Sequence, residues 1–160
     1  MALYTFEREQ VVALPLAQCW PFSCDPRNLA KITPPWLRFQ IRSKLPEEIR
    51  PGLMIRYTVA PLFGLPMTWL TEITQVEEPT YFVDEQRVGP YRIWHHEHFF
   101  RALDSARTEV RDLVHYAPPF GPLGALLNRL LIARQLKQIF DFRREQLARI
   151  SAETTVDSSA

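Results

Sequence analysis

The chain has 160 residues, of which 46% are hydrophobic and 23% charged, and this size and balance are typical of a single soluble globular domain. Its formal net charge of +1 excludes a general role in binding polyanions such as nucleic acids. No apolar run approaches the roughly 20 residues that span a bilayer, and residues 1–20 lack the apolar region of a signal peptide. We therefore expect a cytoplasmic protein whose two cysteines, Cys19 and Cys24, are free and partly buried thiols.

The first part of the chain predicts one strand followed by two short helices. Residues 3–13 alternate loosely between apolar and polar side chains, which favours a strand. One short helix is expected over 16–22 and a second over 25–32, because Asp25 suits the N-cap and Pro26 the first helical position. The Thr-Pro-Pro run that follows ends the second helix, since a residue before proline is pushed out of the helical region.

Six further segments alternate with the period of two that is typical of strands. Short turns separate them, so consecutive strands are expected to pair antiparallel as a meander. An apolar loop at 61–66 is expected to pack against the short helices, or else to cover the mouth of a pocket or contact a membrane or partner. The six segments are 36–43, 53–60, 67–76, 81–88, 91–100 and 108–116.

The period becomes helical over residues 123–150, where apolar residues recur at three- and four-residue steps. About 28 residues at 1.5 Å each make a rod of roughly 40 Å, and its apolar stripe is expected to cover the concave face of the sheet. Its basic residues, Arg143 among them, are expected on a solvated face. Residues 151–160 are small, polar and acidic, and we expect them to form a disordered tail.

These elements predict an α+β fold with a single domain over residues 1–150. A curved antiparallel β-sheet of about six to seven strands would wrap around the long C-terminal α-helix, with the two short helices after the first strand. Side chains from one helix do not fill the space under a strongly curved sheet. We therefore expect a cavity between the helix and the sheet.

The two central strands are expected to border this cavity. One face of the first carries Trp94, His96, His98 and Phe100, and one face of the second carries Asp112 and Tyr116 among others. Large apolar groups mixed with a few titratable ones are typical of a small-molecule pocket. The residues predicted to line the cavity are Trp69, Phe82, Asp84, Gln86, Trp94, His96, His98, Phe100, Asp112 and Tyr116.

The polar members of this set allow more than one interpretation. His96 or His98 with Asp112 suits a general base and its orienting carboxylate, and equally suits a buried, fully hydrogen-bonded network. Asp84 and Gln86 could bind the polar end of a ligand, or pair with arginines of adjacent strands. Two imidazoles and a carboxylate also resemble metal ligands, but no third ligand stands at a fixed spacing, so we predict no metal and no cofactor.

The chain resembles the START-like, or SRPBCC, superfamily, whose members share the helix-grip fold. The resemblance implies binding of an apolar or amphipathic small molecule between helix and sheet, and it is strongest to the polyketide cyclase/dehydrase-like, ligand-binding subgroup. It is carried by Gly89-Pro90-Tyr91-Arg92, the alternating Trp94, His96, His98 and Phe100, the alternating Thr108, Val110, Asp112, Val114 and Tyr116, the run 119–124, and Ile139-Phe140 with Arg143.

Three functional hypotheses follow. The first is binding of an apolar or aromatic small molecule, such as a lipid, polyketide or quinone-like compound. The second is an enzyme of cyclase, dehydratase or hydrolase type, with His96 or His98 as the base and Asp112 as its orienter. The third is a lipid or quinone chaperone that touches membranes transiently through the 61–66 loop and the C-terminal helix. The expected partner is thus a hydrophobic ligand and not a nucleic acid.

Overall fold

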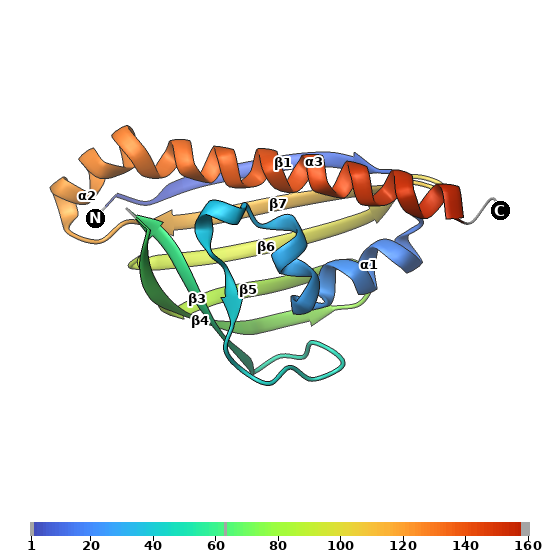
Figure 1. Ribbon diagram of the computed structural model, residues 1–160, viewed down its shortest axis with the longest axis horizontal. Helices are drawn as coiled ribbons and strands as arrows, with labels where there is room; N and C mark the ends of the chain where they lie inside the picture. The colour runs from blue at the N-terminus through green and yellow to red at the C-terminus, as the bar shows by residue number, and fades with distance from the viewer. Residues whose placement is uncertain (1, 63, 158–160) are drawn as a thin grey trace.

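The computed structural model describes residues 2–62 and 64–157, and it confirms the α+β class with a seven-stranded antiparallel sheet under a long C-terminal helix (Figure 1). The strands lie in the order β1-β7-β6-β5-β4-β3-β2. Neighbouring strands are therefore consecutive along the chain, except for the pair β1 and β7. The strands are β1 Tyr4–Val12, β2 Gln40–Ile41, β3 Leu53–Leu62, β4 Leu65–Glu77, β5 Tyr81–Val88, β6 Ile93–Ala102 and β7 Thr108–Ala117.

One expected strand is mostly wrong. Of residues 36–43, only Gln40–Ile41 pair in the sheet, while Pro35–Leu37 form the 3₁₀ turn η2. Proline presets the backbone for such a turn. Arg38 then adopts a left-handed conformation with φ of 47°, which interrupts any extended path through the segment.

The two short helices after β1 are confirmed. They are α1, Leu16–Cys24, which continues through Pro21, and the 3₁₀ helix η1, Pro26–Ile32. The carboxylate of Asp25 accepts a hydrogen bond from the backbone N–H of Arg27, as expected of an N-cap. The two cysteines are free thiols, Cys19 buried and Cys24 partly so.

The C-terminal helical region is longer than expected. It consists of α2, Gly121–Leu127, a π turn η3, Asn128–Ile132, and α3, Ala133–Asp157. The expected disorder is wrong for residues 151–157, which are helical. Ser151 is buried four positions after the buried Leu147, so the inward stripe of α3 extends beyond residue 150. Residues 158–160 of the expected tail lie outside the described residues.

The core is divided into three clusters. One lies around Trp20 and Phe100, one around Val114 and Phe140, and one around Ile55 and Ile73. Helix α3 runs along β1 and β7 (Figure 1) and contributes to the first two clusters. A domain of this size usually has one contiguous core, and the division leaves room for a cavity among the clusters.

Candidate functional site

A cavity of about 200 Å³ lies between the sheet, α3 and the short helices. Strands β3 to β7, helix α3, and the segment from Phe22 to Leu37 all contribute to its wall. Most of the lining side chains are apolar or aromatic, Trp69 and Ile55 among them, and the titratable side chains of β5, β6 and β7 meet in one cluster. This composition is that of a pocket for a mainly apolar small molecule with a polar group.

Strand register brings the polar cluster together. On β6, His96 and His98 are two residues apart and therefore share a face. The pairing places His96 opposite Asp84 of β5 and His98 opposite Asp112 of β7. Directly opposed residues of antiparallel strands also share a face, so two imidazoles and two carboxylates converge from three neighbouring strands.

The four side chains form a closed arrangement in which each imidazole lies between two carboxylates. Asp112 Oδ1 is 2.9 Å from His96 Nε2 and 3.0 Å from His98 Nδ1. Asp84 Oδ2 is 2.8 Å from His98 Nε2 and 3.3 Å from His96 Nδ1. All four ring nitrogens therefore face a carboxylate oxygen. The two imidazole ring centroids are 3.7 Å apart.

Aromatic rings fix the orientation of the imidazoles. The ring of Phe82 stacks on His98 with centroids 4.0 Å apart and planes inclined by 15°. Phe140 of α3 approaches His96 edge-on at 5.7 Å. The cluster is therefore held on both sides by buried apolar groups, which is the environment in which unpartnered polar atoms are costly.

The helix adds a cation that the sequence interpretation misplaced. Arg143 was expected on a solvated face, but its side chain is only 13% exposed and lines the cavity, with Nη1 3.6 Å from Asp112 Oδ1. The spacing of Leu136, Phe140, Arg143 and Leu147 contains the missing signal. Steps of four, three and four residues place Arg143 on the same stripe as three buried apolar residues.

The electrostatics favour charge separation within the cluster. Burial on its own would lower the pKa of His96, but the carboxylates of Asp84 and Asp112 outweigh it and raise that pKa above its usual value. Burial would likewise raise the pKa of Asp112. Hydrogen bonds from both imidazoles and the charge of Arg143 instead lower it well below its usual range.

Asp84 follows the same balance. Burial favours its neutral acid, but the charge of His96 and the hydrogen bonds from the two imidazoles lower its pKa. Two buried carboxylates therefore stay ionised because cations and imidazole donors surround them.

Eight of the ten predicted lining residues do border the cavity: Trp69, Phe82, Asp84, Trp94, His96, His98, Phe100 and Asp112. Gln86 and Tyr116 do not. The Gln86 amide donates to the backbone carbonyl of Tyr91 and accepts from its N–H, so it fixes the β5–β6 turn. Tyr116 is buried in the cluster with Val114 and Phe140 instead.

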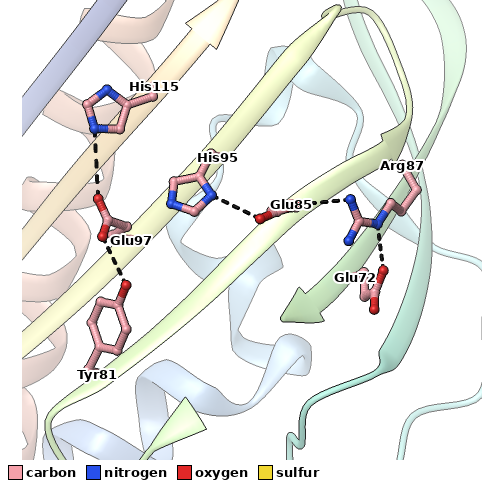
Figure 2. A network of polar contacts seen from close by, with 7 residues as sticks. All are labelled: Glu72, Tyr81, Glu85, Arg87, His95, Glu97 and His115. Carbon is pink, nitrogen blue, oxygen red and sulfur yellow. Dashed lines mark hydrogen bonds and ion pairs between the residues drawn. The ribbon is translucent and has the colours of Figure 1, made fainter. Parts of the chain in front are cut away.

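The outer face of the same strands carries a separate polar network, as the alternation predicts (Figure 2). His95 lies 3.0 Å from Glu85, and Glu97 accepts a hydrogen bond from the hydroxyl of Tyr81. Glu85 is in turn paired with Arg87, which also contacts Glu72. These side chains are partly exposed and face away from the cavity, so the run His95-His96-Glu97-His98 serves two faces.

The family model for polyketide cyclases/dehydrases and lipid transport matches residues 12–143. No curated protein matches the sequence. None of the helices in the described ranges is long and apolar enough to cross a membrane.

Solved structures share the fold at low sequence identity. The aromatase/cyclase ZhuI from Streptomyces sp. R1128 superposes with a TM-score of 0.74 at 15% identity, covering 96% of each chain. Protein Ms6760 from Mycobacterium smegmatis gives a TM-score of 0.68 at 20% identity, covering 94% of this chain and 92% of that one. The di-domain aromatase/cyclase BexL, of the BE-7585A biosynthetic pathway, gives 0.68 at 18% identity, covering 94% of this chain and 46% of that one.

Proposed function

The chain belongs to the polyketide cyclase/dehydrase and lipid transport family, and from that premise we propose that it binds an apolar or aromatic small molecule in the cavity between the sheet and α3. The bound molecule carries an oxygen acceptor that meets Arg143. Apolar walls provide most of the binding free energy, at roughly 25 cal/mol for each Å² of apolar surface removed from water.

The observation that carries this proposal is the state of Arg143. Its Nε is buried and has no hydrogen-bond partner among the described residues. Its Nη1 lies 3.6 Å from Asp112, beyond ordinary hydrogen-bond length. Buried donors in native proteins are nearly always paired, so a carbonyl, phenol or carboxylate oxygen of a ligand is the natural acceptor in this cavity.

The fluorescent probe anilinonaphthalene sulfonate tests the proposal, because it combines aromatic rings with an anionic group. Arg143→Met keeps the length of the side chain and removes its charge and donors. We expect it to weaken binding of the probe about tenfold or more, since hydrogen bonds to charged groups contribute about 1.5–3 kcal/mol. Arg144→Met, at an exposed position one residue further along α3, is the matched control and should change nothing.

Failure of the wild-type protein to bind the probe, or an equal effect of the two substitutions, would contradict the proposal. Native mass spectrometry of the protein purified from its own host then searches for the natural ligand. A co-purifying small molecule that is lost in Arg143→Met identifies the class of compound directly.

The hypothesis of a cyclase, dehydratase or hydrolase receives less support from the same geometry. A general base needs a ring nitrogen within hydrogen-bond reach of the substrate proton. Both nitrogens of His96 face carboxylates instead, and so do both nitrogens of His98. The arrangement therefore favours holding charge and positioning a ligand over abstracting a proton.

One observation favours membrane contact as a second candidate function. Exposed apolar side chains cluster on α2 and the π turn that follows it, and Arg129 and Arg134 are exposed beside them. Such a basic and apolar surface suits an anionic bilayer. Of the loop expected at 61–66, residues 61–62 belong to β3 and 65–66 to β4, and Phe63 lies outside the described residues. The exposed side chains are Phe120, Leu123, Leu126, Leu127 and Leu130.

Co-sedimentation with vesicles of phosphatidylcholine and phosphatidylserine tests this candidate. We expect Leu126→Glu with Leu130→Glu to abolish binding, because both side chains are more than half exposed and would have to enter the bilayer. Leu103→Glu, at the β6–β7 turn, is the control. Sedimentation that persists in the double variant would refute a role for this surface.

A further inference from the structure

The polar cluster contains three side chains that can bind a metal, and they converge from two neighbouring strands. Asp84, His96 and His98 each offer one ligand atom, and these atoms lie within 4.8 Å of one another. The histidines alternate on β6, whereas the carboxylate comes from the neighbouring strand β5. The third ligand therefore stands at no recognisable spacing in the sequence and is supplied by sheet pairing.

The orientation of the two imidazoles fits metal binding on the side of Asp84. Nδ1 of His96 and Nε2 of His98 both face Asp84 Oδ2, at 3.3 and 2.8 Å. A divalent metal with bonds of 2.0–2.2 Å in tetrahedral geometry separates its ligand atoms by about 3.3 Å. The separation of Asp84 and His96 already has this length, and that of Asp84 and His98 needs to open by a few tenths of an ångström. The third separation, between the two histidine nitrogens, is at most 4.8 Å.

The opposite side of the imidazoles carries the supporting contacts that metal-bound histidines need. Nε2 of His96 and Nδ1 of His98 face Asp112 Oδ1 at 2.9 and 3.0 Å. When these nitrogens are protonated and donate to Asp112, the other nitrogen of each ring keeps its lone pair for a metal. A carboxylate behind a ligating histidine fixes its tautomer and ring orientation, and Arg143 is placed to hold Asp112 in its ionised form.

We propose that Asp84, His96 and His98 form a site for a divalent transition metal of the zinc class, with Asp112 as the carboxylate that orients both imidazoles. Two nitrogens and one oxygen are a ligand set that zinc, cobalt and iron accept. Three protein ligands leave a coordination position open toward the cavity, where an oxygen atom of a bound molecule can coordinate the metal. The proposal does not rest on the ligand of the cavity, because the metal is measured without any organic compound present.

The test uses tag-free protein stripped with a chelator and then titrated with Zn²⁺ by calorimetry, with Co²⁺ as a spectroscopic probe. We expect about one zinc per chain, a raised melting temperature, and visible Co²⁺ absorption of a tetrahedral or five-coordinate site. Asp84→Asn and His98→Ala should each weaken zinc binding at least a hundredfold. Asp112→Asn should weaken it about 10–100-fold, the usual effect of removing a carboxylate behind a ligand.

The matched control is His95→Ala, on the same strand but on the outer face beside Glu85 (Figure 2). It should leave zinc affinity unchanged. Zinc binding that His95→Ala abolishes would assign the metal to the outer face and overturn the proposal. A wild-type protein that binds no zinc would also overturn the proposal, and this result does not depend on whether the variants fold.

Loss of the metal and loss of the cavity ligand are distinguishable results. The probe titration with Arg143→Met reports on the cavity, whereas the zinc titration reports on the site of Asp84, His96 and His98 alone. Binding of the probe by metal-free protein that takes up no zinc would leave the proposed function standing and overturn only the metal site.

Discussion

At the scale of single residues, strand alternation decides which of four consecutive side chains belong to the cavity. It correctly separates His96 and His98 from His95 and Glu97, because a strand turns successive residues to opposite faces. The same reasoning did not find Arg143. A long cationic side chain is usually solvated, and only the spacing relative to its buried neighbours on α3 reveals that it faces inward.

Phe82 offers a direct test of how the imidazoles are supported. Its ring is buried, stacks on His98, and meets Trp20 edge-on with centroids 6.0 Å apart. We expect Phe82→Ala to lower the free energy of unfolding by about 3–5 kcal/mol in urea denaturation, because it removes a buried aromatic ring.

The control for Phe82 is Phe99→Ala, on the outer face of the adjacent strand. Phe99 is partly exposed and packs on Tyr81 with ring centroids 4.9 Å apart. Its truncation should cost clearly less, since water already reaches the ring. Equal costs for the two substitutions would mean that Phe82 is not packed as described.

The two cysteines should be almost inert in the folded protein. Burial raises the pKa of Cys19 to about 11, and burial together with the charge of Glu78 raises the pKa of Cys24 to about 12. At pH 8 the reactive thiolate then amounts to about one part in a thousand or less. We expect the native thiols to react with Ellman's reagent about a hundredfold or more slowly than a peptide thiol.

Both thiols should become titratable at once when guanidinium unfolds the chain. Rapid reaction of either cysteine in the native state would show that it is neither buried nor protonated as described. The absence of a disulfide in the structure agrees with the sequence prediction of two free thiols.

At the scale of elements, the β5–β6 turn shows where sequence reasoning loses accuracy. Alternation from Phe82 correctly places Gln86 on the face of Asp84, because Gln86 pairs with Thr71, which lines the cavity. What alternation does not predict is the partner of the amide. The amide of Gln86 instead replaces backbone partners at the turn.

Gln86→Ala separates the two roles. Loss of two partly buried hydrogen bonds should lower the free energy of unfolding by about 1–3 kcal/mol, while affinity for the fluorescent probe stays unchanged. Gly89→Ala should also destabilise the protein, because its added Cβ would collide with the side chain of Gln86. A loss of probe affinity at unchanged stability would return Gln86 to the binding site.

The C-terminal helix illustrates the opposite case, in which pattern predicts an element well but not its end. Three- and four-residue steps identified the helix, since its apolar stripe faces the core along most of its length. They did not reveal that residues 151–157 continue it, because small polar residues carry little periodic signal. The burial of Ser151 is a property of packing that only the assembled structure shows.

At the scale of the whole molecule, α3 connects parts of the core that the cavity separates. Leu147 belongs to the cluster with Trp20, and Leu136 and Phe140 belong to the cluster with Val114. The order of elements predicted this helix-on-sheet architecture. It did not predict the cavity's volume or its full lining, which depend on how curved strands and three short elements meet.

This connection predicts one cooperative unfolding transition. Leu147→Ala should lower the free energy of unfolding by about 2–5 kcal/mol and move the tryptophan fluorescence and circular dichroism curves together. Arg149→Ala, exposed two residues further on, should change it by less than about 0.5 kcal/mol. Two separate transitions in Leu147→Ala would mean that α3 docks on the sheet independently.

The pairing of β1 with β7 has a consequence for how the protein is made. Val12 lies opposite Thr108, so the first strand leaves the ribosome long before its partner does. At 5–20 residues per second, the delay is on the order of 5–20 s. During that interval β1 has no strand to pair with, because β7 has not been made, and the helix that covers the sheet is also missing. Any molecule destined for the interior can therefore be enclosed only in the last moments of synthesis or afterwards.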